Sequence, residues 1–222
     1  MANGGAFVPN SSYSTPTIES TIILKTEQAK RVFNRCFEGA SRALFTIDVI
    51  ARALADTNKS FDHGQVMEAI NKMLNDLERE IVNASGRYET MLKAKGHENT
   101  RCAYTKEATL KFSISTPEIL RFATILSAFD EMIVLFDTCW LCQLVDSKVA
   151  QATRTEKLRM IMRIVRKIQL QATTARKGLQ RTNPSNEVIA AIGDAIGETQ
   201  AERESLEETG KVVAGEDESK AA

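Results

Sequence analysis

The stretch ATLKFSISTPEILRF, residues 108–122, is the clearest structural signal in the chain. Apolar and polar side chains alternate over 108–115, which is the pattern of a strand with one buried face. Thr116 can cap the helix that follows, and Pro117 fits its first position, where the missing N–H costs no hydrogen bond. The apolar residues beyond it predict a central core helix over 117–149.

The same order of elements occurs earlier in the chain. Residues 20–25, STIILK, are rich in β-branched side chains and predict a strand. Thr26 is the expected cap of a helix that ends near Ala55, and a second amphipathic helix stops at Lys95-Gly96. Because each strand needs a partner for its backbone groups, we expect the two strands to pair antiparallel.

The second strand is also followed by two helices. Thr153 and Glu156 have the spacing of a capping box, which predicts the start of a basic helix that runs to about Gln180. The fold class is therefore mainly α (α+β), a long-helix bundle with two short paired strands. Two interpretations follow: the strands form a small cap on an all-helical bundle, or the chain duplicates a ribbon-helix-helix-like unit of one strand and two helices.

Composition divides the chain into three parts. Residues 1–19 are rich in Gly, Ser, Thr, Asn and Pro and are expected to form a disordered arm. Residues 20–181 hold both strand–helix–helix units and are expected to form one core domain. Residues 182–222 are expected to hold a short apolar helix after Asn183-Pro184, followed by an acidic and mostly disordered tail.

The net charge of zero hides two strongly charged segments. Residues 147–181 hold ten Lys and Arg against one acidic residue, a balance of +9, whereas residues 182–222 hold ten Asp and Glu against three basic residues, a balance of −7. Because the charge of a segment sets its local field, the basic helix favours a polyanion partner. The helix contains no aromatic residue, which favours a duplex over stacked single-stranded bases.

Other sequence features indicate the cell compartment expected for the protein. The longest apolar run, around 132–145, contains Asp137 and Gln143 and is shorter than a membrane span. The N-terminal residues lack the basic and apolar regions of a secretory signal. We therefore expect a cytoplasmic protein whose four cysteines are thiols, with no membrane contact.

Motifs for thiol or metal chemistry are weak. Cys139-x-x-Cys142 lies in an apolar helix, where cysteine commonly packs as a small hydrophobic residue, so a core role is favoured over redox chemistry. The other candidate zinc ligands lack a paired spacing; they are Cys36, His63, His97 and Cys102. We expect no metal site.

Motifs for other enzyme chemistry are also weak. Asp130 and Glu131 diverge by about 100° on a helix, so both cannot serve one acid–base site. We expect Asp130 to form hydrogen bonds within the fold and Glu131 to face solvent. No nucleotide-binding, zinc-protease or serine-hydrolase motif occurs, so the sequence predicts neither a cofactor nor an enzyme.

Two short motifs resemble the AcaB family, which is found on conjugative plasmids and integrative conjugative elements. Residues 24–31, LKTEQAKR, run from a strand into a helix as L-x-T-x-x-A-x-R, like the opening of the family. Residues 129–131, Phe-Asp-Glu, are similar to the aromatic-Asp-Glu pattern of its second half. The resemblance covers roughly residues 20–181 and implies a transcriptional activator distantly related to ribbon-helix-helix DNA binders. The tail after Asn183 and the segment 139–142 do not match the family's pattern.

The polar strand faces and the basic helix supply candidate DNA contacts. Strand side chains can pair with base edges in the major groove. The base-reading candidates are Thr21, Ile23, Lys25, Thr109, Lys111 and Ser113. Helix N-termini and cationic side chains can hold phosphates. The phosphate-contact candidates are Thr26, Thr116, Arg154, Lys157, Arg159, Arg163, Arg166 and Lys167. The alternative is a solvated sheet face and a basic helix that only covers the core or neutralises the tail.

These features predict a DNA-binding transcriptional regulator, expected to be an activator, of mobile-element or conjugative transfer genes. It would read double-stranded DNA with a short β-ribbon and the basic helix. The alternative is a non-catalytic helical interaction or scaffold protein of an integrative conjugative element. A homodimer or another protein partner fits either interpretation.

Overall fold

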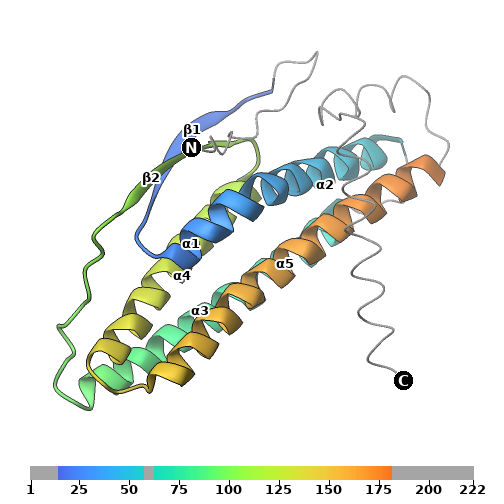
Figure 1. Ribbon diagram of the computed structural model, residues 1–222. Helices are drawn as coiled ribbons and strands as arrows, with labels where there is room; N and C mark the ends of the chain where they lie inside the picture. The colour runs from blue at the N-terminus through green and yellow to red at the C-terminus, as the bar shows by residue number, and fades with distance from the viewer. Residues whose placement is uncertain (1–14, 58–62, 182–222) are drawn as a thin grey trace, which may run out of the picture.

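The computed structural model describes residues 15–57 and 63–181. Within them the chain forms β1 (Ile18–Leu24), α1 (Glu27–Val32), the π-helical turn η1 (Phe33–Phe37), α2 (Glu38–Thr57), α3 (His63–Lys93), β2 (Ala108–Ile114), α4 (Pro117–Leu141) and α5 (Ser147–Arg181). Long helices dominate and the strands are short, which confirms the predicted mainly α (α+β) class (Figure 1). The expected tail and most of the expected arm lie outside the described residues.

The two strands form an antiparallel ribbon, as predicted. Thr21 pairs with Lys111 at its centre. Ile22, Leu24 and Phe112 are buried on the face toward the helices. β1 begins at Ile18 rather than at residue 20, so part of the expected arm is strand. Pairing with β2 supplies hydrogen-bond partners there that local composition does not reveal.

The order of strand, helix and helix occurs twice. β2 (108–114) lies 90 residues after β1 (18–24), and the N-cap residues Thr116 and Thr26 keep the same offset. α3 packs mainly along α4, and α5 packs mainly along α2. The second helix of each half therefore covers the first long helix of the other half, and the two halves interlock.

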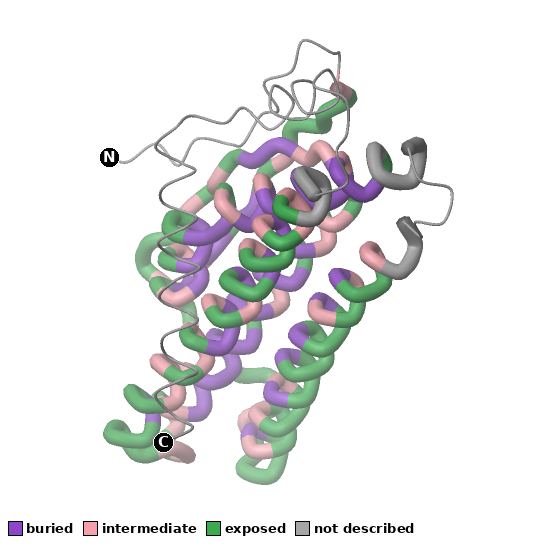
Figure 2. The backbone as a smooth tube through the Cα atoms, turned by 90° about the vertical axis from the view of Figure 1, so that its right-hand side faces the viewer, coloured by how far each residue is buried: buried purple, intermediate pink, exposed green. Residues whose placement is uncertain are grey.

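One hydrophobic core draws buried residues from every described helix and from both strands. Figure 2 shows that buried positions lie on the inward sides of the helices and exposed positions on the outside. α4 supplies many of the buried side chains, as its predicted central place requires. Phe37, the last residue of η1, packs against the rings of Phe112 and Phe122 at centroid separations of 5.2 and 5.6 Å. The π-turn thereby joins the ribbon to the central helix.

The break between α4 and α5 differs from the prediction. α4 ends at Leu141 rather than at residue 149, and α5 begins at Ser147 rather than at Thr153. The Asp146 carboxylate accepts a hydrogen bond from the Lys148 N–H at 2.8 Å and so caps α5. Leu144 and Val145 in the turn still pack on the core near the end of α3, which extends the apolar pattern through the break. Periodicity alone therefore could not place it.

The end of α3 agrees with the prediction. The helix stops at Lys93, and Gly96 adopts a φ of 73° in the turn that follows, a conformation that favours glycine. The preceding connection between α2 and α3 includes residues 58–62, which lie outside the described residues. None of the helices in residues 15–57 and 63–181 combines the length and hydropathy that crossing a membrane requires.

Candidate nucleic-acid interface

The Asp130 carboxylate of α4 joins the end of β1 to the helical core. It accepts hydrogen bonds from the Lys25 N–H at 2.9 Å, the Thr26 N–H at 2.8 Å and the Thr26 hydroxyl at 2.7 Å. Asp130 is 2% exposed. Glu131 faces solvent and pairs with Lys25 Nζ at 2.6 Å, and this hydrogen bond raises the pKa of Lys25. The expectation for both acidic residues is confirmed, and the motifs at 24–31 and 129–131 meet in space.

The outer face of the ribbon presents four of the six base-reading candidates to solvent. Thr21 pairs with Lys111 and Ile23 with Thr109, so these side chains form two cross-strand pairs on one surface. All four are exposed, Ile23 to 57%. A two-stranded ribbon fits the major groove of DNA, where Lys can donate to guanine and Thr can contact several bases. These four exposed residues make up the candidate base-reading surface.

The other two strand candidates, Lys25 and Ser113, are not part of this exposed surface. Lys25 is held by Glu131 at the edge of the helical body. Ser113 occupies an outer-face register position, opposite Glu19, yet it is only 2% exposed. Its buried hydroxyl has no hydrogen-bond partner. Alternation gave the correct face for Ser113 but did not reveal that this position is covered, so Ser113 does not belong to the exposed surface.

A second candidate surface lies on α5. Arg159, Arg163, Arg166 and Lys167 are exposed there, and none of them forms an ion pair with a described residue. The four positions span about 12 Å along the helix. That length corresponds to about three phosphates on one DNA strand. We call these four residues the α5 stripe.

Two other cations of α5 serve the packing of the helix. The Arg154 guanidinium donates to Asp137 at 2.7 Å and lies over the Trp140 ring, 4.7 Å from its centroid. Lys157 lies between Glu80 at 3.8 Å and Glu156 at 3.7 Å. Their side chains are only 15% and 14% exposed. Both attach α5 to neighbouring groups rather than pointing freely into solvent.

The two threonine candidates at helix N-termini are buried. Thr26 is 0% exposed, and its hydroxyl accepts from the Ala29 N–H at 3.2 Å while donating to Asp130. Thr116 is 3% exposed and makes no side-chain cap hydrogen bond. Neither hydroxyl is open to a phosphate in this structure.

The ribbon and α5 lie on different sides of the molecule. In Figure 1 the ribbon follows one edge of the helical body and α5 follows the opposite edge, with α1 and α4 between them. One straight duplex on the ribbon would therefore not also lie along the α5 stripe of the same chain. Joint contact requires strongly bent DNA or a second copy of the chain.

The fold is similar to that of a protein whose structure has been solved. The crystal structure of selenomethionine-containing AcaB from uropathogenic E. coli matches the chain with a TM-score of 0.74 and 24% sequence identity. The match covers 83% of this chain and 94% of that chain. The fold is AcaB-like. No protein-family model and no curated protein matches the sequence.

Cys139 is part of the packed interior of this AcaB-like fold. Cys139 is 0% exposed, its S–H donates to the Tyr88 carbonyl at 3.6 Å, and burial raises the pKa of its thiol. It lies in the last turn of α4, at the negative end of the helix dipole, where a thiolate is not stabilised. The favoured core role agrees with this placement of Cys139, whereas Cys142 lies outside the helix as the C-cap residue of α4 and is only partly buried. Within the described part of the chain, no three His, Cys, Asp or Glu side chains are grouped to hold a metal ion.

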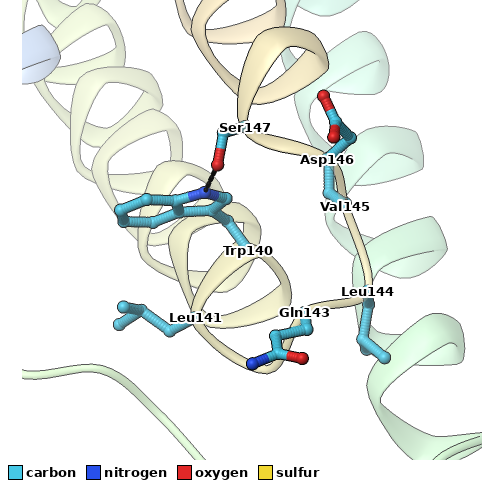
Figure 3. Close-up of a pocket in the computed structure, with 7 residues that line it drawn as sticks. All are labelled: Trp140, Leu141, Gln143, Leu144, Val145, Asp146 and Ser147. Atoms are coloured by element: carbon cyan, nitrogen blue, oxygen red, sulfur yellow. Dashed lines mark hydrogen bonds between the residues drawn. The ribbon is translucent and has the colours of Figure 1, made fainter.

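The α4–α5 turn forms an open recess of about 530 Å³ with a mixed polar and apolar lining (Figure 3). Trp140 forms one side, and its Nε1 donates to the Ser147 hydroxyl at 3.1 Å. Leu141 beside it is 60% exposed, and Val149 on the first turn of α5 is 55% exposed. Exposed apolar side chains around a recess are a feature of protein-binding surfaces, which bears on the scaffold interpretation.

Sequence reasoning missed several arginines that connect elements. Arg121 of α4 donates to Asn71 at 3.0 Å and to Glu78 at 3.1 Å, both on α3. A lone arginine in the most apolar helix was a usable signal. Arg42 of α2 and Arg176 of α5 line one pocket, although they are far apart in the sequence, so spacing could not have paired them.

Proposed function

We propose that the protein is a DNA-binding transcriptional regulator of mobile-element genes and that it reads duplex DNA with the outer face of the ribbon. The observation that carries the proposal is the exposed cross-strand pair of Thr21 and Lys111 at the ribbon centre. The AcaB-like fold and the family motifs support the same class of function. An activating role follows from the resemblance to that family.

In this proposal the two exposed surfaces make different kinds of contact with DNA. Thr21, Ile23, Thr109 and Lys111 would contact base edges, which carry sequence information. The α5 stripe would contact phosphates, which add affinity without sequence preference. Because these surfaces lie on different sides, the α5 stripe would meet a flanking bent segment or the DNA held by a second copy.

The decisive experiment compares Lys111→Ala with Lys93→Ala on a promoter fragment from the same element and on a random duplex. Lys93 is an exposed lysine at the end of α3, away from the ribbon, and serves as the matched control. Lys111→Ala should weaken promoter binding by ~1–3 kcal/mol and leave random-duplex binding nearly unchanged. Lys93→Ala should change neither. Equal weakening on both duplexes by Lys111→Ala would reduce the ribbon to a general basic surface.

The second candidate function is a protein-interaction role, favoured by the exposed Leu141 of the α4–α5 recess and by the exposed Val149 on the first turn of α5. Leu141→Asp should then abolish partner binding while DNA binding stays intact. If Lys111→Ala has no effect on DNA binding at any salt concentration and Leu141→Asp disrupts an assembly, the scaffold interpretation replaces the regulator.

A further inference from the structure

Ile23 is an exposed apolar side chain within a polar surface. It lies on the outer face of the ribbon, opposite Thr109 and next to the pair of Thr21 and Lys111, and it is 57% exposed. The other three side chains of this surface carry hydrogen-bonding groups, and Ile23 carries none. Threonine also favours strands, so strand formation alone does not account for an apolar side chain at this place.

The neighbouring backbone holds Ile23 outward. Ile22 and Leu24 are 4% and 0% exposed on the face toward the helices, so a shift of register that buried Ile23 would expose both of them. The Asp130 carboxylate accepts hydrogen bonds from the next two backbone N–H groups at 2.9 and 2.8 Å. A β-branched side chain also has few rotamers. Ile23 is therefore fixed before it meets a partner, which lowers the entropy cost of binding.

The major groove of DNA presents an apolar group at thymine, the C5-methyl. At the other bases it presents hydrogen-bond donors and acceptors, and an isoleucine placed over them would remove their water without replacing the hydrogen bonds. Contact between Ile23 and a thymine methyl instead removes apolar surface of both partners from water. Ile23 therefore favours thymine over the other bases.

We propose that Ile23 is a specificity-determining residue that recognises the C5-methyl group of a thymine in the bound duplex. The inference rests on the proposed DNA-reading function of the ribbon and specifies the chemistry of one of its contacts. Ile23 and Lys111 are one register step apart, which is two residues or about 7 Å along the strands. This separation corresponds to about two base pairs. The thymine therefore lies about two base pairs from the base that Lys111 contacts.

The test compares a promoter fragment from the same element with the same fragment in which deoxyuridine replaces every thymidine. Deoxyuridine lacks only the methyl group and pairs with adenine in the same way. The unmodified protein should bind the deoxyuridine fragment at least ~4-fold more weakly, which is the effect of losing one buried methyl group. Ile23→Ser should bind both fragments with nearly equal affinity, because the protein and DNA changes remove the same contact.

Ile18→Ser is the matched control. Ile18 is on the same strand and is 66% exposed, but it shares the strand face of Ile22 and Leu24 rather than that of Ile23. This variant should keep the full loss of affinity on the deoxyuridine fragment. Ile23→Val retains a branched apolar side chain and should keep most of it. Thermal unfolding checks that each variant is folded, and the comparison of the two fragments on the unmodified protein needs no variant.

Single deoxyuridine substitutions then locate the contact within the promoter. The sensitive thymine should lie about two base pairs from the guanine whose replacement makes binding insensitive to Lys111→Ala. A sensitive thymine half a helical turn or more from that guanine would contradict the ribbon register and overturn the proposal.

Three further outcomes separate this inference from the function on which it rests. Equal binding of both fragments, together with a clear preference for the promoter over a random duplex, would overturn the inference and leave the proposed function in place. A loss on deoxyuridine that persists undiminished in Ile23→Ser would also overturn the inference, since another residue or the DNA shape would then sense the methyl group. Equal affinity for the promoter and for a random duplex would overturn both.

Discussion

Thr26 and Asp130 lie 104 residues apart in the sequence, yet the backbone N–H and the hydroxyl of Thr26 both donate to the same carboxylate oxygen of Asp130. The equivalent junction after β2 lacks this link. With the 90-residue offset, the position that matches Asp130 is Ala40, or Ser41 if the π-turn adds one residue, and neither carries a carboxylate. The Thr116 hydroxyl is accordingly buried without a partner. One end of the ribbon is therefore anchored more firmly than the other.

Asp130→Asn should destabilise the fold by roughly 2–4 kcal/mol. The amide cannot accept all three hydrogen bonds in the same way, and its NH₂ group would face backbone donors in a buried site. Glu131→Gln is the matched control, because the neighbouring exposed ion pair should contribute less than ~1 kcal/mol. Urea unfolding of both variants gives the comparison. Similar unfolding free energies for the two would show that the Asp130 link does not hold the ribbon.

Neutralising Arg159, Arg163 and Arg166 to glutamine should weaken promoter and random duplexes alike. The slope of log affinity against log salt should fall by about three, roughly one for each lost phosphate contact. Arg154→Gln is the control from the same helix, since Arg154 is held by Asp137 and Trp140. That change should lower the unfolding temperature and leave the salt slope as it was. DNA-binding titrations at several salt concentrations measure this slope. An unchanged slope for the triple variant would exclude the α5 stripe as a phosphate surface.

Deleting residues 198–222 should raise affinity for random duplex without altering the unfolding temperature. The segment is strongly acidic, and a tethered polyanion competes with DNA for the basic helix at high effective concentration. A tail of the same length with its acidic residues changed to glutamine or asparagine should behave like the deletion. Binding assays at low salt are the most sensitive. Equal affinity of full-length and shortened chains would show that the tail does not mask the helix.

The Cys139 thiol should be slow to react with iodoacetamide in the folded protein. Burial raises its pKa above the ordinary value of 9.0, so less of it is thiolate at pH 8, and the site is also closed to the reagent. The pH midpoint of its alkylation rate should be higher in the folded chain than in the urea-unfolded chain. Mass spectrometry of peptides follows each thiol separately. A folded-state midpoint at or below the unfolded one would contradict the core role of Cys139.

Sequence patterns predicted features that depend on local periodicity. Alternation over residues 108–115 gave the buried and open faces of β2, and the angle between Asp130 and Glu131 separated an internal hydrogen-bond acceptor from a solvated acid. Features that depend on distant packing were missed. The apolar Leu144 and Val145 hid the α4–α5 break because they pack on the core outside a helix.

In the candidate site, too, local patterns were predicted and effects of distant packing were missed. Strand alternation predicts that Thr21 and Lys111 are exposed. It does not predict that Ser113, on the same face, is buried, because burial there depends on tertiary packing. Arg154 and Lys157 belong to the basic helix by composition, but only the position of α5 against its neighbours shows that both cations are engaged. Charge counts alone cannot separate packing cations from a binding surface.

The interlocked repeat bears on the symmetry of the DNA that such a ribbon could recognise. A homodimeric ribbon presents the same side chains twice and therefore requires a palindromic operator. Here the two strands have different sequences: Thr21 and Ile23 on β1 oppose Lys111 and Thr109 on β2. If the ribbon reads DNA as we propose, one chain would contact two unlike half-sites, and its operator would not need an inverted repeat.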